Sequence, residues 1–295
     1  MKKYDLHIHS EFSDGEYSIQ EIIKKLRDNG INIFSITDHD NLKSISEVYK
    51  NDLSGLVYIP GIEISCESDN YRMHILGYGI DHTNEDLVKL CSNMKLIKTI
   101  RNLETIKQLK EKHNIIISRE ETEKLLSKKG FVGQVTIAKL LVQKGIIPDV
   151  KYAFNNYFKD MNLGRNATAS LEKAISTIHS AGGYAVLAHP ITLEEEYNIE
   201  IEEIFQMFLD SKIDGIELFN SKHTLSDIKR YLALAKKHNL LTSGGSDFHG
   251  EIVKPNIKLG GLSKENIQKN HHDEINIIDK CMEKVLQNEK SCSVL

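Results

Sequence analysis

Five short clusters place histidine residues, several of them close to acids, at the ends of apolar runs. The clusters read DLHIHS, ITDHD, RMHILGY, LAHP and GGSDFHG, and the chain of 295 residues carries 13 histidines. A single histidine in a strand is most often a structural residue, but five such clusters make that explanation weak. Neutral imidazole combined with Asp and Glu suits Zn²⁺, Mn²⁺ or Fe²⁺ better than Ca²⁺ or Mg²⁺ alone. The sequence therefore predicts a metal site.

The spacing within two of the clusters aims pairs of side chains in one direction. His7 and His9 lie two residues apart in a strand-like run, so both leave the same face of the strand. Asp247 and His249 have the same spacing. Three further candidates lie at the ends of other apolar runs: Glu63, His74 and His189. Groups that are far apart in the sequence would meet if these strands end at one edge of a common sheet.

The elements that must position these groups alternate along the chain. A helix is predicted to start after Ser18 and to stop at Gly30. Strands are predicted over residues 3–9, 31–37, 56–64, 71–79, 183–188, 214–219 and 240–246, and further helices over 42–51, 171–181, 199–211 and 225–238. Such alternation favours parallel β/α architecture. We expect an α/β fold with a distorted seven-stranded (β/α) barrel.

One long section breaks this alternation. Residues 84–165 contain a long helical stretch followed by shorter ones, with no convincing strand, and this section is predicted to be an inserted helical subdomain. The barrel would then comprise residues 1–83 and 166–265, and residues 266–295 would form a C-terminal helical tail.

Composition and charge exclude several classes of protein. The formal net charge of −4, from 42 acidic and 38 basic residues, argues against a protein that grips long nucleic acid by charge alone. No signal-peptide or membrane-spanning apolar stretch is visible. Four cysteines are scattered without a CxxC pair: Cys66, Cys91, Cys281 and Cys292. We expect reduced thiols and a soluble, cytoplasmic protein.

The motifs together resemble a known family. HIHSEFSDG, ITDHD, the strand that contains Glu63, HILGYG, AHP and GSDFH are similar, in order over residues 4–262, to the successive motifs of the PHP (polymerase and histidinol phosphatase) superfamily. The long insertion before GGYAVLAHP is most similar to the branch that includes 3′,5′-nucleoside bisphosphate phosphatases and the 5′→3′ exoribonuclease AM. The resemblance implies a barrel of PHP type and a metal-dependent hydrolase of phosphate esters.

The resemblance also implies a trinuclear site for three divalent ions, Mn²⁺, Zn²⁺ or Fe²⁺. The implied ligands of the first metal are His7, His9, Glu63 and Asp247. Glu63 would bridge to the second metal, whose other ligands are His74 and His189. The third metal would be held by Asp14, His39 and His249. Five of these residues are expected to be catalytic: Asp14, His39, Glu63, Asp247 and His249. A metal-activated water would then attack phosphorus.

Substrate contacts are the least determined part of the prediction. The candidates are Arg101, Arg165 and His223, together with Asp14, His39 and His249. Relatives usually carry a Gly-Arg-Pro-His-like run at Gly133-Gln134-Val135-Thr136, and an aromatic Tyr-Val segment near Arg165-Asn166-Ala167-Thr168. These departures leave the substrate open. Asp38 and Asp40 flank His39, where one of them would orient a ligand imidazole or Asp40 would cap a helix.

Three functions remain compatible with the sequence. The favoured one is hydrolysis of small nucleotides, such as 3′,5′-nucleoside bisphosphates, or of short 5′-phosphorylated RNA. A phosphatase for another small monoester, such as histidinol phosphate, is the second, and a non-catalytic metal-binding interaction module is the third. The expected partner is a small phosphorylated substrate. No long duplex DNA, membrane or obligate protein partner is expected.

Overall fold

The structure is a computed structural model that describes residues 3–127, 133–161, 163, 168–263 and 274–283. Its strands are β1 (Lys3–Ile8), β2 (Ile31–Ile36), β3 (Val57–Tyr58), β4 (Gly61–Ser68), β5 (Tyr71–Tyr78), β6 (Ala169–Ser170), β7 (Tyr184–Leu187), β8 (Gly215–Asn220) and β9 (Leu241–Gly245). Its helices are α1 (Ile19–Asp28), α2 (Lys43–Val48), α3 (Glu85–His113), α4 (Arg119–Ser127), α5 (Gln134–Gln143), α6 (Val150–Ala153), the π-helix η1 (Phe154–Phe158), α7 (Leu171–Ser180), α8 (Pro190–Tyr197), α9 (Ile201–Asp210) and α10 (Leu225–His238). The expected α/β fold is confirmed.

The strands form two sheets, which meet at two places. Strands β1, β2 and β3 make a parallel sheet, and the larger sheet has the order β6-β4-β5-β7-β8-β9. A single bridge between Ile8 and Phe248 links β1 to the end of β9, and another between His39 and Glu63 links the end of β2 to β4. The expected seven-stranded barrel is not confirmed, because isolated bridges rather than continuous ladders join the two sheets, and the sheet is not closed.

Strand β5 departs from the parallel arrangement that the alternation predicts. It runs antiparallel to both of its neighbours, β4 and β7. The reason is the connection from β4, which is only the two-residue turn Asp69-Asn70, with Asp69 in the left-handed region at φ 52°. A turn this short joins antiparallel strands, whereas a parallel pair needs a crossover of a dozen or more residues.

The main hydrophobic core lies between the larger sheet and the helices that cover it. Ile62, Ile75 and Ile216 of the sheet pack with residues of the helices, such as Ile178 of α7 and Phe208 of α9. A second cluster, which includes Ile22 of α1, fills the space beside the small sheet. Strand β8 is buried along its whole length, so even its one acidic residue lies inside the protein.

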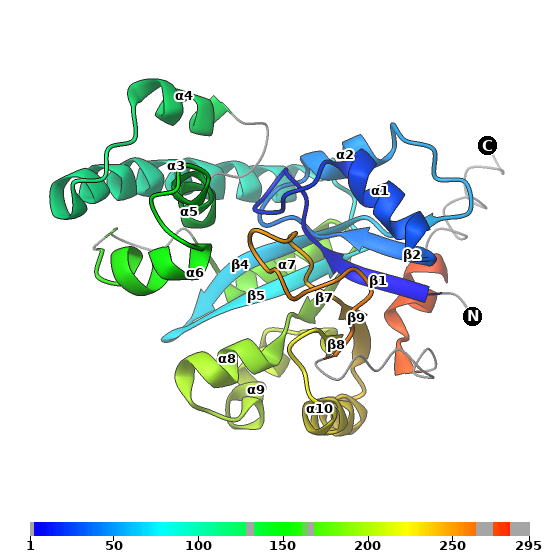
Figure 1. Cartoon of the computed structure of the whole chain (residues 1–295). Helices are drawn as coiled ribbons and strands as arrows, with labels where there is room; N and C mark the ends of the chain where they lie inside the picture. Colours follow the sequence, from blue (N-terminus) through cyan, green and yellow to red (C-terminus); the bar gives the residue numbers. More distant parts are fainter. Residues whose placement is uncertain (1–2, 128–132, 162, 164–167, 264–273, 284–295) are drawn as a thin grey trace.

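The helices between β5 and β6 have a core of their own. Leu109 of α3, Leu141 of α5 and Phe158 of η1 belong to a cluster separate from the two beside the sheets. Figure 1 shows α3 running along one side of the molecule, with α4, α5 and α6 beside it and α9 and α10 on the opposite side. The division of the chain into a barrel, an inserted subdomain over 84–165 and a tail stays a prediction.

Part of the predicted C-terminal tail packs against the main core. Residues 277–283 are helical, and Ile277 and Cys281 lie in the main hydrophobic cluster. The side chain of Asn276 accepts a hydrogen bond from the backbone N–H of Thr242 at 2.8 Å. Within the described ranges, no helix is both long enough and apolar enough to cross a membrane.

Candidate active site

Glu63 of β4 lies at the centre of a cluster of imidazoles. Its carboxylate is fully buried, and ring nitrogens of five histidines lie 2.9–3.3 Å from its oxygens. The histidines facing Oε2 are His7, His9 and His39, and those facing Oε1 are His74 and His189. Residues from the beginning, the first third and the middle of the sequence therefore meet at one carboxylate.

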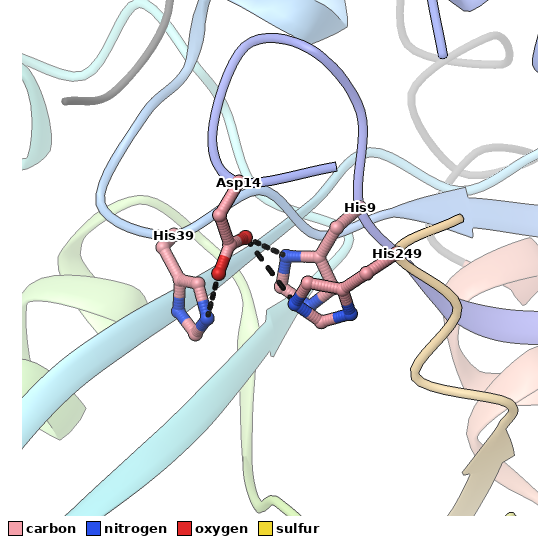
Figure 2. Close-up of side chains that lie close together, drawn as sticks. All are labelled: His9, Asp14, His39 and His249. Atoms are coloured by element: carbon pink, nitrogen blue, oxygen red, sulfur yellow. Dashed lines mark ion pairs between the residues drawn. The ribbon is translucent and has the colours of Figure 1, made fainter. Parts of the chain in front are cut away.

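Asp14 is the centre of a second group, which is drawn in Figure 2. Its Oδ1 lies 3.2 Å from His249 Nε2 and 3.6 Å from His9 Nδ1, and its Oδ2 lies 3.9 Å from His39 Nε2. These four side chains offer donor atoms that all lie within 4.8 Å of one another. They form one of three such groups among the described residues, and the other two share Glu63.

Asp247 joins these groups from the end of β9. Its Oδ1 lies 3.6 Å from His7 Nε2, 3.5 Å from His9 Nε2 and 3.3 Å from His249 Nδ1. Its other oxygen forms an ion pair with Lys254. With Asp247 in place, the structure brings together all nine side chains that the sequence marked as candidate ligands.

The backbone that carries these groups is strained at two of the ligand positions. Asp247 has a φ of 58° and His189 a φ of 26°, both in the left-handed region that residues with a Cβ rarely adopt. Strain of this kind persists where the surrounding structure fixes the conformation, and it is common at functional sites. Each residue lies two positions beyond the end of a strand, β7 or β9, and its side chain lies in the cluster.

Asp14 is held by a loop between β1 and α1. A Cβ on Gly15 would lie 2.4 Å from the backbone oxygen of His9, so only glycine allows the loop to fold back this closely. The ammonium of Lys139 on α5 donates to the backbone oxygens of Asp14, at 3.2 Å, and Gly15, at 2.8 Å. A helix of the predicted insertion thus braces the loop that carries a candidate ligand.

Three buried atoms support a cation at this site. Asp14 Oδ1, His39 Nδ1 and Glu63 Oε2 have no hydrogen-bond partner among the residues that the structure describes. His249 Nδ1 donates to the backbone oxygen of Asp247 at 2.9 Å, so the lone pair of its Nε2 faces Asp14. Lone pairs and carboxylates that converge without donors need a positive charge between them. The residues present fit divalent metal ions.

The charges of the cluster are strongly coupled. Burial raises the pKa of Glu63, but the imidazoles of His39, His7 and His74 outweigh this effect, so its pKa lies well below the usual range. Burial lowers the pKa of His39 well below its ordinary value, and it also lowers that of His189. Burial opposes the effect, but Glu217, Glu63 and Asp247 raise the pKa of His7 well above its ordinary value, and Glu63 raises that of His74. Without a metal, part of the cluster therefore holds protons, and a divalent ion that binds the ring nitrogens would replace them.

A cavity of about 510 Å³ opens beside this cluster. Four of the nine candidate ligands line it: Asp14, His39, His74 and His189. Three basic side chains from β5 and α3 form another part of its wall: Arg72, Lys98 and Arg101. Apolar side chains complete the lining, including Met73, Val135 and Phe154. A volume of this size accommodates a small ligand, and the basic groups favour an anionic one.

The predicted substrate contacts have different outcomes. Arg101 lines the cavity, and its pKa is lowered by burial and by the nearby Arg72. Gln134, where the resemblance implies an arginine, also lines it. His223 does not: it is fully buried, and its Nδ1 donates to the backbone oxygen of Leu218 at 2.9 Å. Arg165 lies outside the described residues.

The two acids beside His39 do not have either of the expected roles. Asp38 accepts hydrogen bonds from Ser10 and Ser13, and Asp40 accepts from the backbone N–H and the hydroxyl of Ser65. Among the described residues, neither acid contacts an imidazole nitrogen, and α2 has no side-chain cap. Serines that are 25 to 28 positions away in the sequence therefore occupy the oxygens of both acids.

Four residues near the site were missed by the sequence analysis: Lys98, Lys139, Glu217 and Lys254. Lys98 could have been found, since it precedes Arg101 by three positions in a predicted helix and so shares its face. Lys139 and Lys254 had no comparable signal, because charged residues of helices and loops are usually solvated. Glu217 lies in an apolar run, where a lone acid is itself a signal of a buried partner.

Comparison with known proteins identifies the family. The family model of the PHP domain matches residues 5–221, which is well over half of the chain. The chain belongs to the PHP domain family. This confirms the resemblance inferred from the motifs, and it adds that the matching region contains seven of the nine clustered side chains, with Asp247 and His249 beyond it.

Similar PHP proteins include two with named activities. A 5′-3′ exoribonuclease of Haemophilus influenzae is 32% identical over 258 residues, which cover 84% of this chain and 90% of the relative. A 3′,5′-nucleoside bisphosphate phosphatase of Chromobacterium violaceum is 29% identical over 252 residues, which cover 84% of this chain and 88% of the relative. These names match the branch expected from the motifs.

A solved structure agrees with this assignment. An amidohydrolase from Chromobacterium violaceum, with bound sulfate and no metal, is similar at a TM-score of 0.75 and 27% identity, covering 85% of this chain and 89% of that chain. The protein is therefore a hydrolase, a phosphoesterase of PHP type, and its clusters of His, Asp and Glu side chains could bind metal ions.

Proposed function

We propose that this PHP protein removes phosphate from small nucleotides, such as 3′,5′-nucleoside bisphosphates, or shortens 5′-phosphorylated RNA. The proposal rests on one observation: candidate metal ligands and basic side chains line the same cavity of about 510 Å³. The named activities of the two relatives, an exoribonuclease and a bisphosphate phosphatase, favour this substrate class.

We further propose three divalent metal ions, chosen from Mn²⁺, Zn²⁺ and Fe²⁺. The first would be held by His7, His9, Glu63 and Asp247. Glu63 would bridge to the second, with His74 and His189 as its other ligands. The third would be held by Asp14, His39 and His249. The close approach of these donor atoms supports the proposal.

When bound, such ions lower the pKa of a water molecule and neutralise the oxygens of a phosphate. The chain's own residues present one side of the cluster to the cavity, because Asp14, His39, His74 and His189 line it. The buried imidazoles and carboxylates behind them exclude bulk water from the far side. A phosphate would therefore approach through the cavity.

The remainder of the cavity would bind the rest of the substrate. Arg101 and Lys98 would attract a second phosphate or the backbone of a short RNA, since both lie on α3 with their side chains at the cavity wall. Phe154 and Val135 would contact a base, because every base offers an apolar face to an aromatic or apolar side chain. A substrate with both phosphate and base uses both parts of the wall.

Phosphate release from adenosine 3′,5′-bisphosphate tests the proposal. The purified protein, reconstituted with Mn²⁺, is assayed beside AMP, histidinol phosphate and a short 5′-phosphorylated RNA. We expect release from the bisphosphate, shortening of the RNA, or both, at rates well above that with histidinol phosphate. Turnover of histidinol phosphate alone, or of none of the four, contradicts the proposed substrate class.

A cytoplasmic location is part of the proposal. The three cysteines within the described ranges are free and buried, namely Cys66, Cys91 and Cys281. Free thiols are typical of a reducing compartment. Fractionation of the native host, with the protein detected by an antibody, tests the location.

A further inference from the structure

Glu217 of β8 is a fully buried carboxylate that does not line the cavity beside the cluster and belongs to none of the candidate metal groups of the described residues. It nevertheless contacts two of the candidate ligands. Its Oε1 lies 2.9 Å from His7 Nδ1, and its Oε2 accepts a hydrogen bond from the backbone N–H of His189 at 2.7 Å. Burying a carboxylate completely is costly, so this one calls for an explanation.

The contact with His7 fixes the chemical form of its ring. Because a carboxylate only accepts hydrogen bonds, Nδ1 of His7 must carry the proton. The lone pair of the neutral ring then lies on Nε2, which faces Glu63 at 3.3 Å and Asp247 at 3.6 Å. Glu217 therefore lies behind the ring and turns its metal-binding nitrogen toward the cluster.

The contact with His189 fixes a strained backbone. The φ of His189, at 26°, lies in the left-handed region, and its N–H is anchored to Glu217. The side chain of the same residue reaches Glu63 at 2.9 Å. Asn220 donates to the same oxygen of Glu217 at 3.0 Å and keeps the carboxylate in place.

We propose that Glu217 is a positioning residue that orients His7 and His189 and thereby raises the affinity of the PHP centre for metal ions. This inference rests on the proposed function, because His7 and His189 are assigned there to the first and second metals. Partners of this kind, which contact a ligand and not the metal, typically change metal affinity by about 10–100-fold.

The informative variant is Glu217→Gln, which keeps the size of the side chain and removes its charge. An amide has one acceptor atom, so it cannot accept from both His7 and His189 in the present way. If its NH₂ group faces His7, Nδ1 must become the acceptor and the proton moves to Nε2. If its oxygen faces His7, the NH₂ group points at the N–H of His189, so two hydrogen-bond donors face each other and that N–H loses its acceptor.

Two measurements test the inference. The first is titration of the metal-free protein with Mn²⁺ by calorimetry, for which we expect a loss of affinity of about 10–100-fold relative to the unsubstituted protein. The second is the tautomer of His7 in the metal-free protein, read by ¹⁵N NMR of the imidazole nitrogens at alkaline pH, where the ring is neutral. We expect the Nδ1–H form in the unsubstituted protein and its loss, or a weaker hydrogen bond, in Glu217→Gln.

Glu194→Gln is the matched control. Glu194 is another buried carboxylate, bonded to Arg230 and Tyr231 and outside the candidate metal groups. This control is expected to lose stability and to keep its affinity for Mn²⁺. Should Glu217→Gln fail to fold, Asn220→Ala replaces it and is expected to lose affinity to a smaller extent.

The outcomes separate this inference from the proposed function. Unchanged Mn²⁺ affinity and an unchanged His7 tautomer in Glu217→Gln, or unchanged affinity in Asn220→Ala when that variant is used, overturn the positioning role. If the unsubstituted protein itself binds no Mn²⁺, the metal assignment fails, and the tautomer in the metal-free protein alone decides whether Glu217 orients the ring.

Discussion

Lys98 of α3 forms an ion pair with Asp40, the residue that directly follows His39. Asp40 is buried, its φ of 50° is in the left-handed region, and its two oxygens also accept from the backbone N–H and the hydroxyl of Ser65. The long helix that borders the cavity thus also braces the loop that presents His39. One helix therefore supports both a group proposed to bind substrate and a group proposed to bind metal.

We expect Lys98→Met to lower both stability and activity. The substitution leaves the buried carboxylate of Asp40 without its cation, which costs about 3 kcal/mol of unfolding free energy. Because the loop that carries His39 then shifts, kcat/KM for the bisphosphate should fall at least about tenfold. Urea unfolding and steady-state assays measure the two effects. Lys95→Met, an exposed lysine on the same helix, is the control and should change neither.

Asp247→Asn and His249→Ala should each lower turnover of the metal-loaded protein at least about a hundredfold, because each removes a group proposed to hold a metal that stabilises the transition state. Circular dichroism should show that both variants keep the fold, since neither side chain belongs to a hydrophobic core cluster. A near-normal rate in either variant, measured with saturating Mn²⁺, would refute the trinuclear assignment.

Gly245→Ala should push β9 away from β1. A Cβ at this position would lie 2.2 Å from the backbone nitrogen of His7, so β9 must move away from β1. We expect a loss of about 3 kcal/mol in unfolding free energy, together with the loss of turnover, because Asp247 moves with the strand. Gly145→Ala, whose added methyl meets open space at a φ of 68°, should cost only about 1 kcal/mol and leave turnover intact. If the two variants lose the same unfolding free energy and the same turnover, the close contact between β9 and β1 is not the cause.

His223 makes the protein less stable in mild acid. Burial lowers its pKa to about 4, whereas an unfolded histidine titrates near 6.5. The unfolded state therefore takes up the proton first, so stability contributed by the neutral ring is present above about pH 6.5 and is lost as the pH falls toward 4. The loss is about 2 kcal/mol at pH 5.

Urea unfolding at pH 7 and pH 5 measures this effect. Since other groups titrate in the same range, the quantity to compare is the change in free energy between the two pH values, in the protein and in His223→Gln. We expect the change to shrink by about 2 kcal/mol in the variant. His113→Gln on α3 serves as the control, and the same reduction in both variants counts against a specific role of His223.

Gln134→Arg should alter substrate preference. Gln134 lines the cavity at a position where the resemblance implies an arginine, so the substitution adds a cation to the wall of the proposed substrate site. We expect kcat/KM for adenosine 3′,5′-bisphosphate to rise about tenfold, in line with one additional charge-assisted hydrogen bond. The rate with a nucleotide that has a single phosphate should change little. A similar rise for both substrates argues for a non-specific effect of charge.

The sequence predicted the site better than the sheet around it. Most of the nine candidate ligands lie at or just beyond a strand end, and strand ends are visible as breaks in apolar runs. The exceptions are Glu63 within β4, His74 within β5 and Asp14 in the loop after β1. The direction of β5 could have been recognised from the short turn at Asp69-Asn70, but the alternation elsewhere outweighed it. Closure of the barrel depends on long-range pairing, which no local pattern of residues reports.

The missed residues have a common physical reason. His223 was placed at the mouth because it follows a strand, yet its burial depends on packing against Tyr231, a residue of the next helix. Glu217 and Lys139 act through contacts with residues more than 100 positions away. Composition and periodicity describe neighbours along the chain, so contacts between distant segments lie beyond them.

The pairing of β1 with the segment after β9 also determines when, during synthesis, the site can form. The N–H of Asp247 donates to His7 at 2.8 Å, and that of His9 donates to Phe248 at 2.9 Å, so the first strand is completed by the last. During translation, a growing chain holds His7 long before it holds Asp247. An incomplete chain on the ribosome therefore lacks part of the proposed metal centre until synthesis has passed β9.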